Sequence, residues 1–234
     1  MLSVVVPAFN EARRLPETLD SLRAYLDARD EAYEVIVADD GSVDGTARLV
    51  TARAGLWPQL RLVRLGRNTG KGAAVRAGML AAQGDLRLFT DADMSTPIDQ
   101  LPRLREAIHG ETAVAIGSRA VPGAVIEVHQ PWRREFMGRS YNRLLRLLAL
   151  PGLHDTQCGF KLFTAEAAQA CFEPLQTLRF GFDAEVLLRA RRRGWRIAEV
   201  GVHWRHADES RVSPLRDSAA TFNDLIRLRL RRRD

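Results

Sequence analysis

Short, almost continuously apolar runs alternate with longer amphipathic segments along the first half of the chain. Runs rich in valine, isoleucine and leucine are typical of strands that are buried on both faces of a sheet. The segments between them carry helix-start signals such as Pro16, Asp44 and Thr96. We therefore expect strands at 3–6, 35–38, 60–65, 86–89 and 113–116, and helices at 16–28, 45–54, 71–82 and 98–109.

The regular alternation of strand and helix predicts an α/β fold, a mostly parallel Rossmann-like sheet with helices on both faces. In such sheets, ligands bind beyond the carboxyl ends of the strands. Four of the predicted strands are followed within a few residues by polar side chains, which would meet in one crevice. These residues are Asn10 and Glu11, Asp39 and Asp40, Asn68, and Asp91 and Asp93.

Two common phosphate-binding loops are missing from the sequence. The first turn, VPAFNEARRLP, has no glycine and so lacks the G-x-G-x-x-G loop of dinucleotide-binding folds. The segment GRNTGKG at 66–72 spaces its glycines one residue too closely for a P-loop, and no serine or threonine follows Lys71. Neither a dinucleotide-dependent dehydrogenase nor a P-loop nucleotidase fits this chain.

Asp91 and Asp93 form a D-x-D sequence directly after a predicted strand. Residues two apart in an extended segment face the same side, so both carboxylates could contact one cation. Like charges this close resist ionisation unless a positive charge lies between them, and hard cations prefer oxygen ligands. An exposed acidic turn is the alternative, and the two residues taken alone do not exclude it.

Composition places the chain among globular proteins. No apolar run reaches the roughly 18 to 20 residues that a membrane span needs. The N-terminal segment becomes polar too early for a signal peptide, and Cys158 and Cys171 form no disulfide framework. We therefore expect a protein of the reduced, cytoplasmic compartment.

The net charge of +6 is unevenly distributed. Residues 1–117 carry −2 and residues 118–234 carry +8. A basic second half suggests an anionic partner: nucleic acid, an acidic membrane surface or a phosphate-bearing substrate. The alternative is a solvated surface in an arginine-biased sequence, because all but two of the 35 basic residues are arginines.

Four blocks of the first half together resemble glycosyltransferase family 2, inverting enzymes of the GT-A type. The blocks are VVVPAFNE, EVIVADDGSVDGT, NTGKGAAVRAGM and FTDADMSTP. The resemblance implies one GT-A domain in which residues 1–117 bind a nucleotide sugar and residues 118–234 bind the acceptor. It also implies that Asp91 and Asp93 hold Mg²⁺ or Mn²⁺ on the donor diphosphate. The other residues implied in donor binding are Pro7, Ala8 and Glu11 at the base and ribose, Asp39 and Asp40 at the base, Lys71 and Ala92.

Three segments of the second half narrow the resemblance to polyprenyl-phosphate sugar synthases, above all the dolichyl-phosphate β-glucosyltransferases. They are GSR at 117–119, WRREFMGRSYNRLLRLL from Trp132, and DTQCGFKLF from Asp155. Mannose synthases often carry a glutamine where this chain has Ser95. The resemblance therefore implies transfer of a hexose, glucose from UDP-glucose, to a polyprenyl or dolichyl phosphate. Another donor (GDP-mannose or UDP-GlcNAc) or a non-lipid acceptor stays open.

The acceptor phosphate is already an anion at neutral pH, so the enzyme must above all hold two negative substrates together. Arginine binds phosphate in a bidentate manner and suits that task. We expect Arg119 to act in catalysis by holding the acceptor, together with one of Arg133 and Arg134. The full set of candidate acceptor residues is Arg119, Arg133, Arg134, Ser140, Asp155 and Gln157, with turn capping as the alternative for Asp155 and Gln157.

Several other features have less definite interpretations. His206 could complete the metal site, whereas His203 is more typical of a solvent-facing turn. Cys158 shows no sign of a reactive thiolate, and Phe182 favours packing at a helix start over lipid binding. The tail DLIRLRLRRRD suits either anionic lipid headgroups or a solvated helix. Because a polyprenyl tail is insoluble, we expect peripheral association with the cytoplasmic face of the membrane.

A nucleic-acid-binding protein is the alternative from a different functional class, prompted by the pI of about 10.1. The chain has no interleaved aromatic platform and no nucleic-acid recognition motif. That alternative also leaves the D-x-D sequence unexplained. We therefore expect no nucleic-acid partner.

Overall fold

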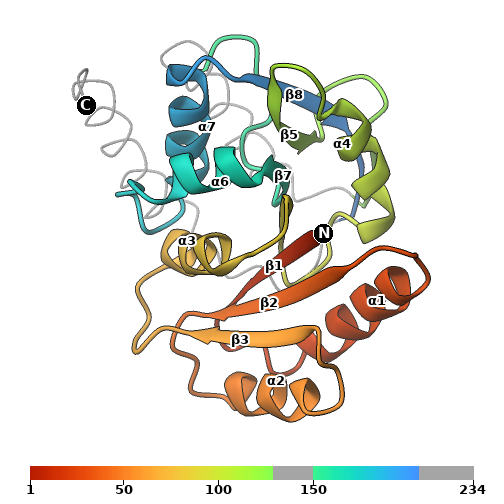
Figure 1. The fold of residues 1–234 in the computed structure, drawn as a ribbon, viewed down its shortest axis with the longest axis vertical. Helices are drawn as coiled ribbons and strands as arrows, with labels where there is room; N and C mark the ends of the chain where they lie inside the picture. The colour runs from red at the N-terminus through yellow and green to blue at the C-terminus, as the bar shows by residue number, and fades with distance from the viewer. Residues whose placement is uncertain (129–149, 206–234) are drawn as a thin grey trace.

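A seven-stranded sheet lies at the centre of the computed structural model, which describes residues 1–128 and 150–205. Its strands follow the order β3-β2-β1-β4-β7-β5-β8 (Figure 1). All run parallel except β7, which is antiparallel to both β4 and β5. This confirms the expected mostly parallel sheet. The strands are β1 (Leu2–Ala8), β2 (Tyr33–Asp39), β3 (Leu60–Arg64), β4 (Leu86–Thr90), β5 (Thr112–Ser118), β7 (Phe160–Thr164) and β8 (Arg196–Gly201).

The helices of the first half begin and end close to the predicted positions. The expected helix at 98–109 is instead divided into a 3₁₀ turn and α4. Pro102 explains the break, because it lacks the N–H that would bond the carbonyl of Ile98 in a continuous α-helix. The helical elements are α1 (Leu15–Asp27), α2 (Thr46–Ala54), α3 (Lys71–Ala81), η1 (Ile98–Gln100), α4 (Leu101–Ala107), α6 (Ala165–Phe172) and α7 (Phe182–Arg192).

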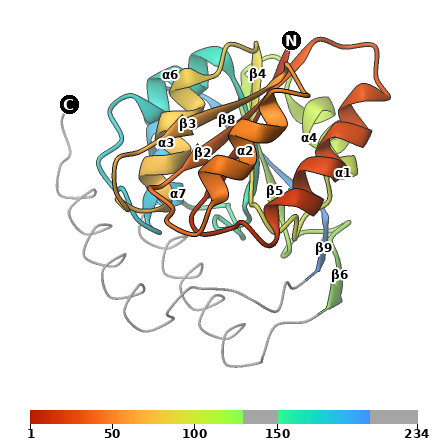
Figure 2. The same ribbon diagram turned by 90° about the horizontal axis from the view of Figure 1, so that it is seen from below.

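Helices cover both faces of the sheet, as the sequence predicts (Figures 1 and 2). One buried cluster joins the sheet to α3, α6 and α7, and a second joins the opposite face to α1, α2 and α4. Neighbouring residues of β1 divide between them: Val5 packs in the first cluster, whereas Val4 and Val6 pack in the second. This is the alternation of side chains that a strand buried on both faces requires.

A small second sheet continues from the carboxyl ends of β5 and β8 (Figure 2). It pairs β6 (Val125–Val128) with β9 (His203–Arg205). Among the described residues, no helix combines the length and apolar character needed to cross a bilayer. Four of the residues discussed above, together with the basic tail, fall outside the described parts of the chain: Arg133, Arg134, Ser140 and His206.

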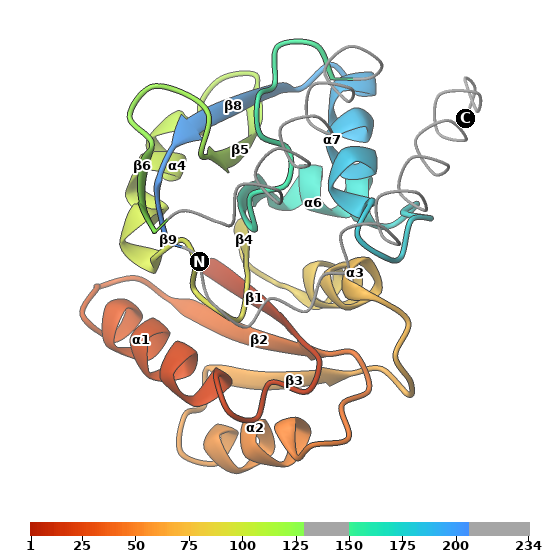
Figure 3. The same cartoon turned by 180° about the vertical axis from the view of Figure 1, so that it is seen from behind.

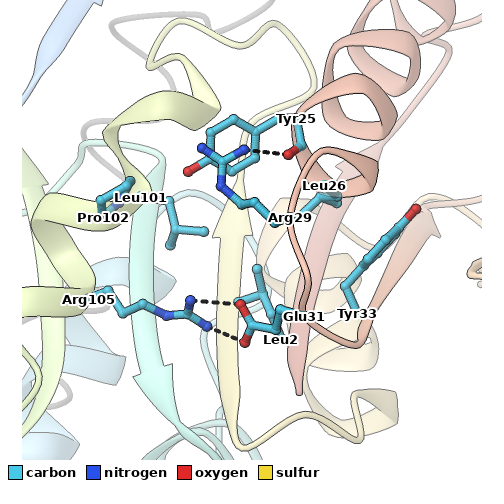
Figure 4. Close-up of a pocket in the computed structure, with 9 residues that line it drawn as sticks. All are labelled: Leu2, Tyr25, Leu26, Arg29, Glu31, Tyr33, Leu101, Pro102 and Arg105. Carbon is cyan, nitrogen blue, oxygen red and sulfur yellow. Dashed lines mark hydrogen bonds and ion pairs between the residues drawn. The ribbon is translucent and has the colours of Figure 1, made fainter.

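A small cavity of about 90 Å³ lies between α1 and α4, at the end of the sheet where β1 and β2 begin (Figure 4). Arg105 reaches across it from α4 and pairs with both carboxylate oxygens of Glu31. The guanidinium of Arg29 lies over the ring of Tyr25. These polar side chains bind one another. We therefore interpret the cavity as a gap in the packing between two helices, at the edge of the sheet opposite the D-x-D turn.

Candidate active site

The loops after β1 and β2 are tied together at the carboxyl edge of the sheet. The N–H of Asn10 donates to Ser42 Oγ (2.8 Å), and the N–H of Val43 donates to Asn10 Oδ1 (2.9 Å). The N–H of Glu11 donates to Thr46 Oγ1 (2.9 Å). Asn10 has a φ of 55°, a left-handed conformation that asparagine tolerates better than most residues. Polar residues of the blocks VVVPAFNE and EVIVADDGSVDGT therefore hold the loop after β1 against the loop after β2.

The predicted donor residues of β1 lie at this edge. Pro7 and Ala8 end the strand, and the carbonyl of Ala8 accepts the N–H of Asp40 (2.8 Å). The carboxylate of Glu11 is held by both Nε and Nη2 of Arg14, at 2.8 and 2.7 Å. The carboxylate of Glu11 is therefore fixed in position and paired with a positive charge.

The paired aspartates after β2 have different surroundings. Both oxygens of Asp40 accept backbone N–H groups, from Thr69 and from Gly70, at 2.8 Å each. Asp40 therefore anchors the loop that leads into α3. Asp39 is fully buried, and its Oδ2 has no hydrogen bond among the described residues, although Nε of Arg64 forms an ion pair with it at 3.2 Å. In this structure Asp39 Oδ2 is therefore closed to solvent and charge-paired with Arg64.

The D-x-D turn after β4 has a constrained backbone. Met94 has a φ of 48°, and a non-glycine residue in that region stores roughly 1–3 kcal/mol of strain, most often at functional sites. The N–H of Ser95 donates to Asp93 Oδ1 (3.0 Å). From α1, Thr18 Oγ1 donates to the carbonyl of Ala92 (2.6 Å). The turn is therefore held from two sides, as a preorganised binding site requires.

Lys71 lies beside the carboxylates of this turn. Nζ of Lys71, at the start of α3, forms an ion pair with Asp91 Oδ1 at 2.6 Å. Burial, and then repulsion from Asp91, raise the pKa of Asp93. Burial alone would lower the pKa of Lys71, but Asp91 and Asp183 raise it overall. One lysine faces the two carboxylates of the turn, so the donor set and its charge fit a hard cation.

The approach to Asp93 is open on the side of α1. A pocket of about 200 Å³ lies there, and Asp93 lines it together with Arg14 and Arg205. Among the described residues, no group of three or more histidine, cysteine, aspartate or glutamate side chains could hold a metal ion. Among the described residues, the ligands available to a cation at this turn are therefore the carboxylates of Asp91 and Asp93.

Gly159, just before β7, allows the Asp91 carboxylate to reach its position. A Cβ atom at residue 159 would lie 2.0 Å from Asp91 Oδ2, so the carboxylate could not keep this position beside a larger residue. The N–H of Asp91 donates to the carbonyl of Gly159 (3.0 Å). The glycine of the DTQCGFKLF segment is therefore explained by its contact with the D-x-D turn.

Arg119 and Asp155 form a buried bidentate ion pair after β5. Nε of Arg119 donates to Asp155 Oδ2 (2.6 Å), and Nη2 donates to Oδ1 (2.9 Å). The N–H of Arg119 also donates to Oδ2, and the N–H of Gln157 donates to Oδ1 (3.2 Å). Turn capping, the alternative for Asp155, is thus visible in the structure. The described residues leave Nη1 of Arg119 available to a ligand.

The environment of this pair keeps both groups charged. Burial would raise the pKa of Asp155, but the Arg119 guanidinium outweighs it and lowers the pKa to about 2. Burial would likewise lower the pKa of Arg119, but Asp155 raises it. The guanidinium also lies 5.3 Å from the centroid of the Trp204 ring. Arg119 is therefore fixed in orientation before any ligand arrives.

The sequence analysis missed a second buried ion pair, between Lys161 on β7 and Asp183 on α7. Nζ of Lys161 also donates to the carbonyl of Cys158 (2.6 Å). Lys161 and Lys71 lie on the ring of Phe89, at 5.1 and 5.6 Å from its centroid. A lysine within the apolar run FKLF is the sequence signal that could have revealed this pair.

Two smaller expectations are confirmed, and a third is confirmed in part. Cys158 is buried, and burial raises the pKa of its thiol to about 11, so it is no reactive thiolate at neutral pH. Phe182 is buried at the start of α7 and packs on Phe89, with ring centroids 5.7 Å apart. His203 is exposed, as expected, but it lies on strand β9 instead of in a turn.

A sequence model described as "Glycosyl transferase family 2" matches residues 3–172. The chain belongs to this family. The matched region contains the loops after β1 and β2, the D-x-D turn, Arg119, Asp155 and Gly159, so the family assignment and the site geometry rest on the same residues.

Family 2 relatives with similar sequences include several named dolichyl-phosphate beta-glucosyltransferases. One from Trichomonas vaginalis is 40% identical over 89% of this chain and 65% of that protein. Those of Dictyostelium discoideum and Homo sapiens are 36% and 35% identical over 98% of this chain, and 74% and 75% of their own lengths. The chain thus spans about two thirds to three quarters of these relatives.

Among solved structures, a similar one is the crystal structure of glucosyl-3-phosphoglycerate synthase from Mycobacterium tuberculosis with Mn²⁺, uridine-diphosphate and phosphoglyceric acid. Its TM-score is 0.72 at 22% identity, covering 98% of this family 2 chain and 77% of the other. The likeness confirms the expected GT-A type of fold.

Proposed function

We propose that this family 2 glycosyltransferase moves glucose from UDP-glucose to the phosphate of a polyprenyl or dolichyl lipid, with inversion at the anomeric carbon. The names of its relatives support the glucose and the lipid phosphate. The geometry of the site supports the binding of two anionic substrates side by side.

One observation carries the proposal: the segment 155–159 contacts both halves of the site. Asp155 binds Arg119 at one end of the segment, and Gly159 contacts Asp91 at the other. Five residues span at most about 18 Å, and Asp91 is near enough to help raise the pKa of Arg119, so a phosphate held by Arg119 and a diphosphate held near Asp91 would lie in the same region. β4 and β5 also both end at this edge of the sheet.

On the donor side, Asp39 Oδ2 would accept an N–H of the base, such as uracil N3 provides, with Arg64 displaced from it. Asp91 and Asp93 would hold Mg²⁺ or Mn²⁺, which when bound neutralises charge on the departing diphosphate. Lys71 adds a fixed positive charge beside Asp91. His206 stays a candidate for a further ligand, although it lies outside the described residues.

On the acceptor side, Arg119 would bind the phosphate through Nη1 while Asp155 fixes the other end of its guanidinium. One phosphate oxygen then forms the bond to the anomeric carbon as the bond to the UDP oxygen breaks, and UDP leaves with that electron pair. No proton has to move, because the acceptor oxygen is already anionic. The site therefore needs alignment more than a general base.

We further propose that the enzyme works at the cytoplasmic surface of a membrane. The lipid acceptor is insoluble, and the residues 118–234 carry a net charge of +8, which would favour anionic headgroups. The basic tail is the segment proposed for this contact, alongside residues 121–153.

The proposal is tested by offering a panel of nucleotide sugars with a short polyprenyl phosphate, Mg²⁺ and Mn²⁺, and by determining the product anomer by NMR. We expect UDP-glucose to be preferred and the product to be the β-linked glucosyl phosphate. A preference for GDP-mannose or UDP-GlcNAc would change the donor. Retention of configuration would exclude inversion, and salt-sensitive DNA binding that nucleotide sugars do not affect would favour the nucleic-acid alternative.

Gly159→Ala tests the fit at the D-x-D turn. The added Cβ would push the Asp91 carboxylate aside, so turnover should fall at least about tenfold and Mn²⁺ affinity, measured by electron paramagnetic resonance, should weaken. Gly55→Ala is the matched control, because Gly55 has a helical φ of −63° and its Cβ would meet an atom no closer than 3.4 Å. Wild-type Mn²⁺ binding by Gly159→Ala would contradict this account of the motif.

A further inference from the structure

Glu199, on β8, is a buried carboxylate that neither the donor nor the acceptor chemistry uses. Its side chain is 7% exposed. β8 lies beside β5 (Figure 3), and Glu199 pairs with Ile116 of that strand. Oε1 accepts Ser118 Oγ and the N–H of Asp155, both at 2.7 Å. Oε2 accepts the N–H of His154 (2.8 Å) and lies 3.2 Å from its Nδ1.

These contacts make Glu199 a poor general base or ligand. Four groups already surround its two oxygens, and buried carboxylates with this many partners are structural or orienting groups. Two of the four are consecutive backbone N–H groups, at residues 154 and 155. Glu199 therefore fixes the path of the main chain at the residue whose carboxylate holds Arg119.

Ser118 connects the same carboxylate to the other member of the pair. Ser118 ends β5 and immediately precedes Arg119, and its Oγ also accepts the N–H of Ala120 (3.1 Å). Glu199, on β8, therefore contacts the main chain of Asp155 and the residue that precedes Arg119.

We infer that Glu199 is a positioning residue that sets the orientation of Arg119 toward the acceptor phosphate, acting through Asp155 and Ser118. The inference rests on the proposed role of Arg119 in acceptor binding. The Arg119–Asp155 pair has no net charge, so its contribution to binding a phosphate depends on where Nη1 points. Orientation is what an anchored carboxylate supplies.

Glu199→Gln is the principal test, because it keeps the size of the side chain and places an NH₂ group where an acceptor oxygen is needed. We expect the KM for a short, soluble polyprenyl phosphate to rise by about tenfold, the effect of misaligning one charge-assisted hydrogen bond. The KM for UDP-glucose and the dissociation constant of UDP should stay at wild-type values.

Glu34→Gln is the matched control. Glu34 is also a buried carboxylate, it accepts from Ser3, Gln83 and Arg61, and it lies at the opposite edge of the sheet. Its loss should lower thermal stability without changing the acceptor KM. An equal rise of acceptor KM in both variants would show general loosening and overturn the inference.

A second readout does not depend on activity. Hydrogen exchange of the Arg119 Nε–H with water, followed by NMR and assigned through Arg119→Lys, should be slow in the wild type because Asp155 accepts that hydrogen. Exchange should accelerate by about tenfold or more in Glu199→Gln as the carboxylate loses its alignment. Glu34→Gln should not change it.

The two readouts separate the inference from the proposed function. If the wild type does not use a polyprenyl phosphate but exchange accelerates in Glu199→Gln, the function fails and the positioning role stands. Unchanged exchange in a folded Glu199→Gln overturns the positioning role, whatever the acceptor is. If that variant does not fold, Ser118→Ala, which removes one of the contacts, decides in the same way with a smaller expected acceleration.

Discussion

Replacing Asp93 by asparagine is expected to lower kcat by about a thousandfold or more, comparable with the loss of a key electrostatic group in other active sites. The amide keeps the shape of the side chain and can still bond the N–H of Ser95, but it lacks the charge a hard cation requires. Turnover should be measured by UDP release, and Mn²⁺ binding to the substrate-free protein by electron paramagnetic resonance.

The same substitution should leave the fold intact or slightly more stable in the absence of metal. The pKa of Asp93 is raised by burial and by Asp91, so its negative charge is disfavoured in the folded protein at neutral pH. Removing that charge should not lower the Tm. Asp30→Asn, at an exposed acid, is the control for kcat. Full activity of the wild type in EDTA would remove the metal from the proposal.

The second large effect concerns Arg119. Arg119→Ala should lower kcat/KM for the acceptor by about ten- to a hundredfold or more, because a charge-assisted hydrogen bond contributes roughly 1.5–3 kcal/mol. Arg119→Lys keeps the charge but loses the planar guanidinium, so it should also be clearly impaired. The affinity of the free enzyme for UDP should hardly change.

The ion pair complicates the alanine variant in a way that can be controlled. Removing one partner of a buried ion pair destabilises proteins by about 3–5 kcal/mol, and Arg119→Ala removes the guanidinium that pairs with the buried Asp155. Adding Asp155→Asn should restore much of the Tm without restoring acceptor kinetics. If Arg119→Ala instead leaves acceptor kinetics untouched and weakens UDP binding, the acceptor site has been assigned to the wrong place.

The parallel strands and the convergence of their polar ends could be predicted because buried strands are almost continuously apolar and their exits are not. The division of the expected helix at 98–109 could also have been predicted, because Pro102 interrupts the hydrogen bonding of a continuous helix. Boundaries elsewhere agree to within a few residues. Local patterns are enough for such features, because they depend on residues close together in the sequence.

The remaining features depend on contacts between distant residues. Nothing near Asp155 in the sequence shows that its partner is Arg119, or that Glu199 on β8 contacts both Asp155 and Ser118, the residue before Arg119. Asp40 is another example. The sequence block around it suggests a contact with the ligand, but its carboxylate oxygens accept backbone N–H groups of the loop before α3. One sequence does not reveal which polar groups support a site and which face the substrate.

The antiparallel strand β7 has a consequence for how the protein is made. β4 and β5 do not pair with each other, because β7 lies between them and pairs with both. During synthesis, the first 118 residues leave the ribosome with an unpaired edge at β4 until residues 160–164 follow and insert. An unpaired strand edge invites pairing with other chains. Until β7 emerges, the open edge of β4 can therefore pair with other chains, and a fragment ending at residue 117 would carry that open edge permanently.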